Sequence, residues 1–370
     1  MGMQLRNACV QIDLSAYSRN IRTLRAFIGH DVQLMAVVKG NAYGHGLIPA
    51  ARAAVCSGAD WLGVALAEEG VTLREAGIKQ PILIHSGINQ AGFYAAAVHG
   101  LTATVFDENS AIAANAAGIS VGRMVDIHVK IDTGMGRIGV RSQEALNKLL
   151  RRIAHSPGVR LTGAYSHFAD ADNPDPAYTD AQLARFLSAT KELPEGLLVH
   201  AAASAAALSR RDTHLDMVRI GIASYGYPPV PTTLPLEKCL RLSTEVTQVK
   251  DIEPGCYVGY GRTYRADRNL RIATLAIGYG DGYARALSSR GKVLIRGVPC
   301  PVLGRICMDQ TMVDVSHVPD VRTGDIAVLL GRQDGQEIDA NDIAAWRGTI
   351  AYEVLLSPTP RLPVIYMEEQ

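Results

Sequence analysis

The chain has 370 residues, of which 48% are hydrophobic and 20% charged, and its formal net charge is +1. This composition is typical of a globular protein with one or two domains, and the near-neutral charge gives no support for nucleic-acid or membrane-surface binding. No apolar run reaches the roughly 18 residues that a membrane helix needs, and the N-terminus shows no signal peptide. The six cysteines form no CxxC pair, which argues against a zinc site and a disulfide framework. We therefore expect a cytoplasmic protein that holds no metal.

Apolar runs typical of strands alternate with amphipathic helical stretches through the first part of the chain. A short strand at residues 8–14 precedes a helix that carries Tyr17, Ile21, Leu24 and Phe27 at helical spacing. The strand-like runs that follow are residues 32–38, 61–66, 81–85, 103–106, 125–131, 161–168, 197–202 and 217–223. The helical stretches between them include residues 47–57, 68–76, 91–99, 109–117, 144–155 and 180–193. Eight repeats favour a (β/α)₈ barrel over an open doubly wound sheet, and no GxGxxG follows a strand.

The pattern changes at residues 227–235, YPPVPTTLP, where four prolines predict a linker. Mostly β sequence follows, with strand-like runs at residues 241–252, 255–259, 270–277, 292–303, 312–315 and 326–330. A short helix is expected at residues 340–346. We predict a (β/α)₈ barrel over residues 1–230, whose first strand is free to pack with the second domain, and a smaller, mostly β domain over residues 231–370.

One lysine stands at the end of the second strand, in the stretch AVVKGNAYGHG at residues 36–46. An amine at the end of a buried strand is costly unless it is paired or covalently engaged. Gly40, Gly44 and Gly46 allow the backbone to approach a ligand closely. Taken alone, Lys39 is also consistent with a lysine whose charged tip reaches solvent beside a flexible loop.

Polar residues end several barrel strands, and in this fold the loops after the strands form the active-site mouth. The residues in these positions are Lys39 and Tyr43; Lys130, Asp132 and Arg137; Ser166, His167 and Asp170; His200 and Ser204; and Arg219, Gly221 and Ile222. Because they recur at five strand ends, we predict that they share one site.

The loops after the last two strands suggest a phosphate site. Barrels often bind phosphate there through backbone N–H groups and a hydroxyl, and Ser204 with the Gly221 and Ile222 amides has this placement. A local turn at Ser204 and a helix start at Gly221 are the alternative. A buried lysine with a phosphate site suggests pyridoxal 5'-phosphate (PLP), which needs an amine and a phosphate cradle.

Arg219 bears on the reaction class. PLP enzymes that need a strong electron sink place a carboxylate against the pyridine nitrogen. Arginine is a fixed cation that only donates hydrogen bonds, so it would leave that nitrogen unprotonated. This favours deprotonation at Cα over decarboxylation or β-elimination. Without the other motifs, an ion pair at a strand end would also explain Arg219.

Racemisation needs an acid/base group on each face of Cα. Lys39 can serve one face, and the second domain offers tyrosine-rich turns for the other. The candidates are Tyr257, Tyr260, Tyr264, Tyr279, Tyr283 and Tyr352. Tyrosine has a reference pKa of about 10, so a tyrosine base needs nearby cations. These side chains are equally consistent with sheet packing, and the residue pattern does not choose among them.

The motifs together resemble the alanine racemase family over nearly the whole chain. They are AVVKGNAYGHG, VKIDTGMGRIGV, SHFADAD, VRIGIASYG, YVGYGRTY, IGYGDGY and GRICMDQ, in the family's order and spacing. The resemblance implies a fold-type III PLP barrel followed by a β domain. It also implies a head-to-tail homodimer whose active sites each borrow residues from the partner, and a cytoplasmic enzyme that supplies D-alanine for peptidoglycan.

The resemblance also implies residue roles. Lys39 matches the lysine that binds PLP covalently and acts as the base on D-alanine, and Tyr260 matches the base on L-alanine, contributed by the other subunit. His167 and Arg219 match the hydrogen-bonded relay between that tyrosine and the pyridine nitrogen. Arg137 matches the residue that contacts the cofactor's phenolic oxygen and the substrate carboxylate.

Further residues match binding positions of the family. The Met308 amide matches a second carboxylate contact, Asp309 and Tyr279 match residues along the substrate's access path, and Lys130 matches a lysine that is often carbamylated. The residues that match the phosphate cradle are Tyr43, Ser204, Gly221, Ile222 and Tyr352.

The chain departs from the family pattern at two places. Ala203 stands where many members have asparagine, and His85 with Ser86 stands where the family is usually apolar. Tyr352 favours alanine over serine, because related serine racemases of glycopeptide-resistance clusters tend to carry asparagine there. The alternatives are a serine or broad-specificity racemase, a fold-type III PLP decarboxylase and a non-catalytic PLP-binding protein.

Overall fold

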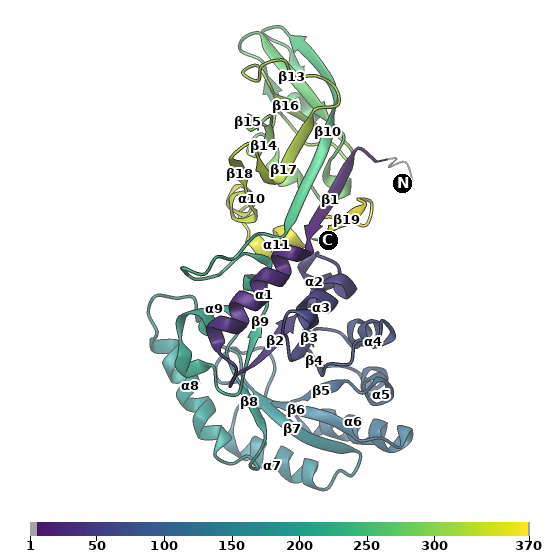
Figure 1. Cartoon of the computed structure of the whole chain (residues 1–370), viewed down its shortest axis with the longest axis vertical. Coiled ribbons are helices and arrows are strands. Elements are labelled where there is room, and N and C mark those ends of the chain that lie inside the picture. Colours follow the sequence, from purple (N-terminus) through teal and green to yellow (C-terminus); the bar gives the residue numbers. More distant parts are fainter. Residues whose placement is uncertain (1–5, 369–370) are drawn as a thin grey trace. The chain divides into compact units, whose positions relative to one another are not determined.

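The computed structural model describes residues 6–368 and contains two compact units (Figure 1). One unit spans residues 16–237, and the other combines residues 6–15 with residues 238–368. Strand β1 (Ala8–Asp13) belongs to the second unit because it pairs antiparallel with β10 (Leu240–Ile252). The proline-rich stretch before β10 forms no helix or strand, as its composition predicts.

The larger unit is a nearly closed parallel barrel, which confirms the predicted fold class. Its strands are β2 (Gln33–Val37), β3 (Trp61–Val64), β4 (Ile82–Ile84), β5 (Thr102–Val105), β6 (Val125–Lys130), β7 (Val159–Tyr165), β8 (Leu198–His200) and β9 (Met217–Ile220). They are hydrogen-bonded in the order β8-β7-β6-β5-β4-β3-β2-β9. An isolated parallel bridge between Ala203 and Arg219 joins the two ends. All eight strands coincide with runs that periodicity predicts.

Helices follow the strands of this unit. They are α1 (Leu14–Ile28), α2 (Lys39–Tyr43), α3 (Leu47–Cys56), α4 (Ala67–Glu75), α5 (Gln90–His99), α6 (Glu108–Val121), α7 (Gln143–Ala154), α8 (Ala177–Thr190) and α9 (Ser204–Ser209), with 3₁₀ turns η1 (Arg211–Thr213) and η2 (Ile222–Tyr225). Several begin at a side chain that accepts a backbone N–H: Asn89 starts α5, Asp107 starts α6 and Ser142 starts α7.

The smaller unit is built on a nine-stranded sheet. Besides β1 and β10 it contains β13 (Leu270–Leu275), β14 (Lys292–Ile295), β15 (Val298–Pro301), β16 (Thr311–Asp314), β17 (Ile326–Gln333), β18 (Gln336–Ile338) and β19 (Val364–Met367). A two-stranded ribbon pairs β11 (Tyr257–Val258) with β12 (Tyr264–Arg265), and short turns η3 (Tyr260–Arg262), η4 (Tyr279–Asp281) and η5 (Arg285–Leu287) join strands. Two helices complete the unit, α10 (Ala340–Arg347), where a helix is predicted, and α11 (Ala351–Leu355).

The predicted run at residues 292–303 is two strands rather than one. β14 and β15 pair as a hairpin whose turn residues, Arg296 and Gly297, have φ values of 52° and 71°. Positive φ at both central residues is typical of the tight turn that matches strand twist. The apolar alternation continues through the turn, so periodicity did not reveal it.

The described residues also constrain other properties of the chain. Within residues 6–368, no helix is long and apolar enough to cross a membrane. In the same range no group of three or more His, Cys, Asp or Glu side chains is placed to hold a metal ion. Free thiols are carried by Cys9, Cys56, Cys256, Cys300 and Cys307.

Candidate active site

The barrel gathers nine predicted site residues at the C-terminal ends of its strands. Because the strands are parallel, the loops that follow them lie on one edge of the barrel. The residues are Lys39 and Tyr43 after β2, Lys130 at the end of β6, Arg137 in the next loop, His167 after β7, Ser204 after β8, Arg219 on β9, and Gly221 and Ile222 after β9.

Lys39 is followed by a turn of left-handed backbone. Gly40 has a φ of 63°, and the three non-glycine residues Asn41, Ala42 and Tyr43 have φ values of 51°, 54° and 54°. Left-handed backbone costs roughly 1–2 kcal/mol for each residue with a Cβ. Such strain persists only where the surroundings over-determine it, and it is concentrated at functional sites. The constrained turn speaks against the alternative interpretation of this stretch, in which a flexible loop follows Lys39.

Glu69 holds this turn in place. Its Oε1 accepts the N–H groups of Gly40 at 2.6 Å and Asn41 at 3.4 Å. Its Oε2 accepts those of Ala65 at 2.9 Å and Leu66 at 3.2 Å, at the start of α4. Sequence reasoning missed Glu69. Its signal is a glutamate at the third position of a helix, where it caps the N-terminus.

The environment of Lys39 makes its amine reactive. Partial burial lowers its pKa most, the positive charges of Arg137 and Arg219 lower it further, and the carboxylate of Glu69 opposes them. A lysine whose pKa is lowered in this way is deprotonated more readily near neutral pH, which nucleophilic and base catalysis require.

We expect Glu69→Gln to lower the pKa of Lys39 further. The variant keeps the shape of the side chain but removes a negative charge that favours the protonated amine. The acid limb of the pH dependence of PLP attachment to the apoprotein, followed by absorbance, should therefore move to lower pH. Glu68→Gln changes the exposed neighbouring glutamate and should leave the limb in place. Equal shifts in both variants would contradict this role of Glu69.

Arg219 is a buried cation whose guanidinium is held by several acceptors. Nη1 donates to His200 Nδ1 at 3.0 Å, and Nη2 donates to His167 Nδ1 at 3.1 Å and to the carbonyl oxygens of Ser166 at 2.9 Å and Ala201 at 2.8 Å. Burial lowers the pKa of Arg219 to about 10, so it stays charged at neutral pH. Burial of the His167 ring lowers its pKa most, and the charge of Arg219 lowers it further. The pKa of His167 therefore lies well below its usual value, and this imidazole is neutral.

Tyr165 forms a buried platform beneath this cluster. Lys130 Nζ lies 4.0 Å from the centroid of its ring, and the Arg219 guanidinium carbon lies 5.3 Å from it. The Tyr165 hydroxyl lies 2.8 Å from Thr104 Oγ1 and 3.2 Å from the carbonyl oxygen of His85. Burial raises the pKa of Tyr165 to about 12, so its phenol stays neutral beside Lys130 and Arg219.

Four of the five predicted phosphate residues, Tyr43, Ser204, Gly221 and Ile222, lie after strands β2, β8 and β9 of the barrel. The Gly221 N–H donates to Ser204 Oγ at 3.0 Å. A Cβ on Gly221 would lie 2.5 Å from the Tyr43 hydroxyl oxygen, so only glycine allows this approach. Ser204, Tyr43 and Ile222 are all buried. A hydroxyl, a phenol and adjacent backbone amides are donors that suit a phosphate.

The two places where the chain departs from the family pattern lie in the same unit. Ala203 forms the bridge that closes the barrel against Arg219. The His85 imidazole Nε2 lies 3.3 Å from Met35 Sδ, and burial lowers the pKa of His85 well below its usual value. His85 is therefore a neutral imidazole that packs inside the barrel.

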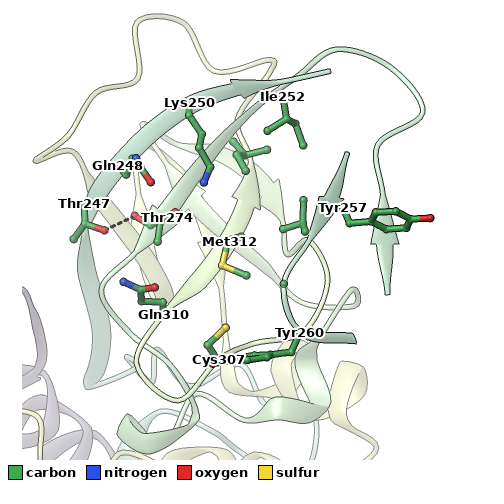
Figure 2. Close-up of a pocket in the computed structure, with 13 residues that line it drawn as sticks. Thr247, Gln248, Lys250, Ile252, Tyr257, Tyr260, Thr274, Cys307, Gln310 and Met312 are labelled. Atoms are coloured by element: carbon green, nitrogen blue, oxygen red, sulfur yellow. Dashed lines mark hydrogen bonds between the residues drawn. The ribbon is translucent and has the colours of Figure 1, made fainter. Parts of the chain in front are cut away.

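The remaining predicted residues, Tyr260, Tyr279, Met308, Asp309 and Tyr352, belong to the smaller unit. Tyr260 is 71% exposed and stands between Gly259 and Gly261, whose φ values are 74° and 72°. It lines a cavity of about 720 Å³ together with Cys307, Gln310 and other residues of the sheet face (Figure 2). Tyr260 is therefore largely accessible to solvent while it borders this cavity.

Tyr279, Met308 and Asp309 are held together by two neighbouring loops. The Tyr279 N–H donates to the Cys307 carbonyl at 3.0 Å, and the Gly280 N–H donates to that of Met308 at 2.9 Å. Arg361 donates to Asp309 at 2.6 Å and pairs with the buried Asp281 at 3.5 Å. Sequence reasoning gave no role to Arg361, whose only signal is its charge, or to Asp281, although Asp281 lies within the IGYGDGY motif. Tyr352 lies on the exposed side of α11.

Comparison with known proteins gives a consistent result. The sequence matches the profile of the alanine racemase N-terminal domain over residues 12–229 and that of the alanine racemase C-terminal domain over residues 239–366. An alanine racemase from Symbiobacterium thermophilum is 44% identical over 369 residues, covering 98% of this chain and 97% of that protein.

Solved structures show the same likeness. The crystal structure of alanine racemase from Bacillus anthracis with bound L-Ala-P has a TM-score of 0.92 and 37% identity, covering 100% of this chain and 97% of that one. A histidine racemase from Leuconostoc mesenteroides subsp. sake has a TM-score of 0.89 and 28% identity, covering 99% of this chain and 100% of that one. The shared fold thus occurs with more than one amino-acid substrate.

Proposed function

Because this chain belongs to the alanine racemase family, whose members depend on PLP, we propose that it interconverts L- and D-alanine by a two-base mechanism. One observation carries the proposal: Lys39 and Arg219 lie at the same barrel mouth. The pKa of Lys39 is lowered, and Arg219 is a buried cation. The first provides a reactive amine, and the second provides hydrogen-bond donors only.

The residues of the barrel mouth fit PLP. Lys39 offers an amine for covalent attachment to the aldehyde of the cofactor. Gly221 admits the Tyr43 phenol close to its backbone, and its N–H donates to Ser204 Oγ. We assign Tyr43, Ser204, the Ile222 amide and the Gly221 amide, which would turn from Ser204 to a phosphate oxygen, to the phosphate of the cofactor, and Tyr352 from the resemblance. When bound, PLP withdraws electrons from the substrate Cα and so eases removal of its proton.

The two bases act on opposite faces of Cα. We assign Lys39 Nζ to accept the Cα proton of D-alanine and Tyr260 Oη to accept that of L-alanine. In each direction the other group returns a proton to the opposite face, so the charge and proton count balance over one turnover. The Arg137 guanidinium and the Met308 amide bind the substrate carboxylate, while Asp309 and Tyr279 line its access path.

Arg219 directs the reaction toward racemisation. Its N–H groups can only donate to the ring nitrogen of the cofactor, so that nitrogen stays unprotonated and the electron sink stays moderate. His167, which accepts from Arg219 at 3.1 Å, links this guanidinium to the Tyr260 phenol in the proposed site. A decarboxylase would be expected to place a carboxylate where this chain has Arg219.

We assign Lys130 as a carbamylated lysine. Burial and the charges of Arg219 and Arg137 lower its pKa well below the usual value, which favours the neutral form of the amine. A neutral amine adds to carbon dioxide by forming an N–C bond and releasing a proton, and the resulting anion would offset the surrounding positive charge. With ¹³C-labelled bicarbonate, we expect a carbamate signal in the NMR spectrum that Lys130→Ala loses. An unchanged signal in that variant would refute the assignment.

The quaternary structure and biological role follow from the same assignment. We propose a homodimer in which each site takes Tyr260 from the other subunit, which agrees with the 71% exposure of Tyr260 in one chain. We also propose that the enzyme works in the cytoplasm, where free thiols persist, and supplies D-alanine for peptidoglycan.

A panel of L-amino acids tests the proposed function. Purified protein with PLP should convert alanine to the D-isomer faster than serine or histidine. A faster reaction with serine or with many substrates would support the broader racemase. Release of carbon dioxide would indicate a decarboxylase, and bound cofactor without exchange of the Cα proton in deuterated water would indicate a non-catalytic protein.

A further inference from the structure

A chain of buried hydrogen bonds extends from Arg219 away from the residues assigned above. Arg219 Nη1 lies 3.0 Å from His200 Nδ1, and His200 Nε2 lies 3.0 Å from His128 Nδ1. Both imidazoles are fully buried and Arg219 is 3% exposed. His128 is connected to the Arg219 guanidinium through two successive hydrogen bonds, by way of His200. The proposed reaction gives His128 no role.

The chemistry of arginine sets the direction of every bond in this chain. A guanidinium has no acceptor, so His200 Nδ1 must accept a hydrogen bond from it, and the neutral ring must then carry its own proton on Nε2. That N–H donates to His128 Nδ1, which places the His128 proton on Nε2. Burial and the charge of Arg219 lower the pKa of His200 well below its usual value, and burial above all lowers that of His128 to about 3. Both rings are therefore neutral: His200 accepts from Arg219, and His128 accepts from His200.

The packing leaves the rings little freedom to rotate. Gly163 on β7 stands beside His128, and a Cβ there would lie 2.7 Å from two atoms of the imidazole. The Trp61 ring centroid lies 5.4 Å from that of His128. The His200 ring stacks on Tyr165 at 4.9 Å with an interplanar angle of 0°. Strands β6, β8 and β9 thus carry the three hydrogen-bonded side chains, and residues of β7 pack against the two imidazole rings.

We propose that His128 is a positioning residue for this racemase: by accepting a hydrogen bond from His200 it fixes the orientation of the Arg219 guanidinium. This inference rests on the proposed function, because it is Arg219 that meets the cofactor ring there. Arg219 also donates to His167 Nδ1, so an Arg219 that turned away would release both imidazoles. His128 itself touches neither substrate nor cofactor in this assignment. The alternative is that His128 only fills space.

Two substitutions separate these roles. His128→Asn can present its amide oxygen where Nδ1 now accepts, whereas His128→Leu fills the space with no acceptor. We expect His128→Leu to lower kcat for alanine about tenfold with little change in KM, and to shift the absorbance maximum of bound PLP. His128→Asn should recover most of kcat and the original absorbance.

His214→Leu is the matched control, because it removes another buried imidazole, whose Nε2 lies 2.8 Å from the Ala207 carbonyl. It should lower the thermal midpoint without changing kcat or the absorbance maximum. If both His128 variants behave like His214→Leu, or if His128→Asn is no better than His128→Leu, His128 only fills space and the inference is wrong.

Tautomers measured in the wild-type apoprotein test the inference independently of activity and of any variant that fails to fold. Ring ¹⁵N chemical shifts should show neutral His200 and His128 with the proton on Nε2. A proton on Nδ1 of either ring would overturn the inference. If the wild type racemises no amino acid, the proposed function fails, while the tautomers and the absorbance shift still report whether His128 positions Arg219.

Discussion

Lys39→Ala should abolish racemisation of alanine and prevent covalent attachment of PLP. Lys39 is assigned two roles, as the attachment point and as the base on one face of Cα. Loss of a positioned base alone typically costs about 10²–10⁴-fold in rate. Because the attachment point is lost as well, we expect a larger effect, with conversion in both directions below detection.

The measurements for this variant are a chiral assay of both alanine isomers and the absorbance band of bound PLP. Lys79→Ala is the control, since Lys79 is an exposed lysine after α4 that belongs to no site described above. It should keep both the rate and the band. A Lys39→Ala protein that retains the band of covalently bound PLP and still racemises L-alanine would show that another residue carries both roles.

Tyr260→Phe should remove the base on the other face and leave Lys39 in place. We expect the rate of racemisation to fall about 10²–10⁴-fold. In deuterated water, D-alanine should still exchange its Cα proton, because Lys39 can take the proton and return deuterium to the same face. L-Alanine should lose its exchange. This asymmetry distinguishes loss of one base from general damage to the site.

Tyr257→Phe is the matched comparison for Tyr260→Phe. Tyr257 lines the same cavity of the smaller unit and is 51% exposed, but the resemblance gives it no role (Figure 2). We expect its rate to stay within about twofold of the wild type, as is usual for an exposed substitution away from the site. Equal losses in the two variants, or exchange lost for both isomers, would count against Tyr260 as the base on L-alanine.

Mixing the two inactive variants tests whether each site is shared between subunits. In a dimer of one Lys39→Ala and one Tyr260→Phe chain, one site would hold both substitutions and the other site would hold neither. Random exchange of equal amounts makes about half of the dimers mixed, so about a quarter of wild-type activity should return. No recovery after proven subunit exchange would place Lys39 and Tyr260 of the same chain in one site.

The sequence by itself determined the elements and the strand ends. Strand and helix periods are local properties, so the eight barrel strands and the positions of Lys39, Ser204 and Arg219 after or on them could be predicted from patterns of a few residues. The parallel topology then implied that these strand ends share one edge. The family resemblance assigned roles to Tyr260 and the other residues, which periodicity alone did not distinguish.

Only the tertiary structure decided how the site is held. The left-handed turn at Asn41, Ala42 and Tyr43 goes against local backbone preference, and Glu69, from the next strand–helix repeat, accepts the N–H groups of Gly40 and Asn41 where the turn begins. The bond from His200 to His128 joins residues 72 positions apart, on strands that lie on either side of β7 in the folded sheet. Such contacts depend on distances in space, and a local sequence pattern carries no information about them.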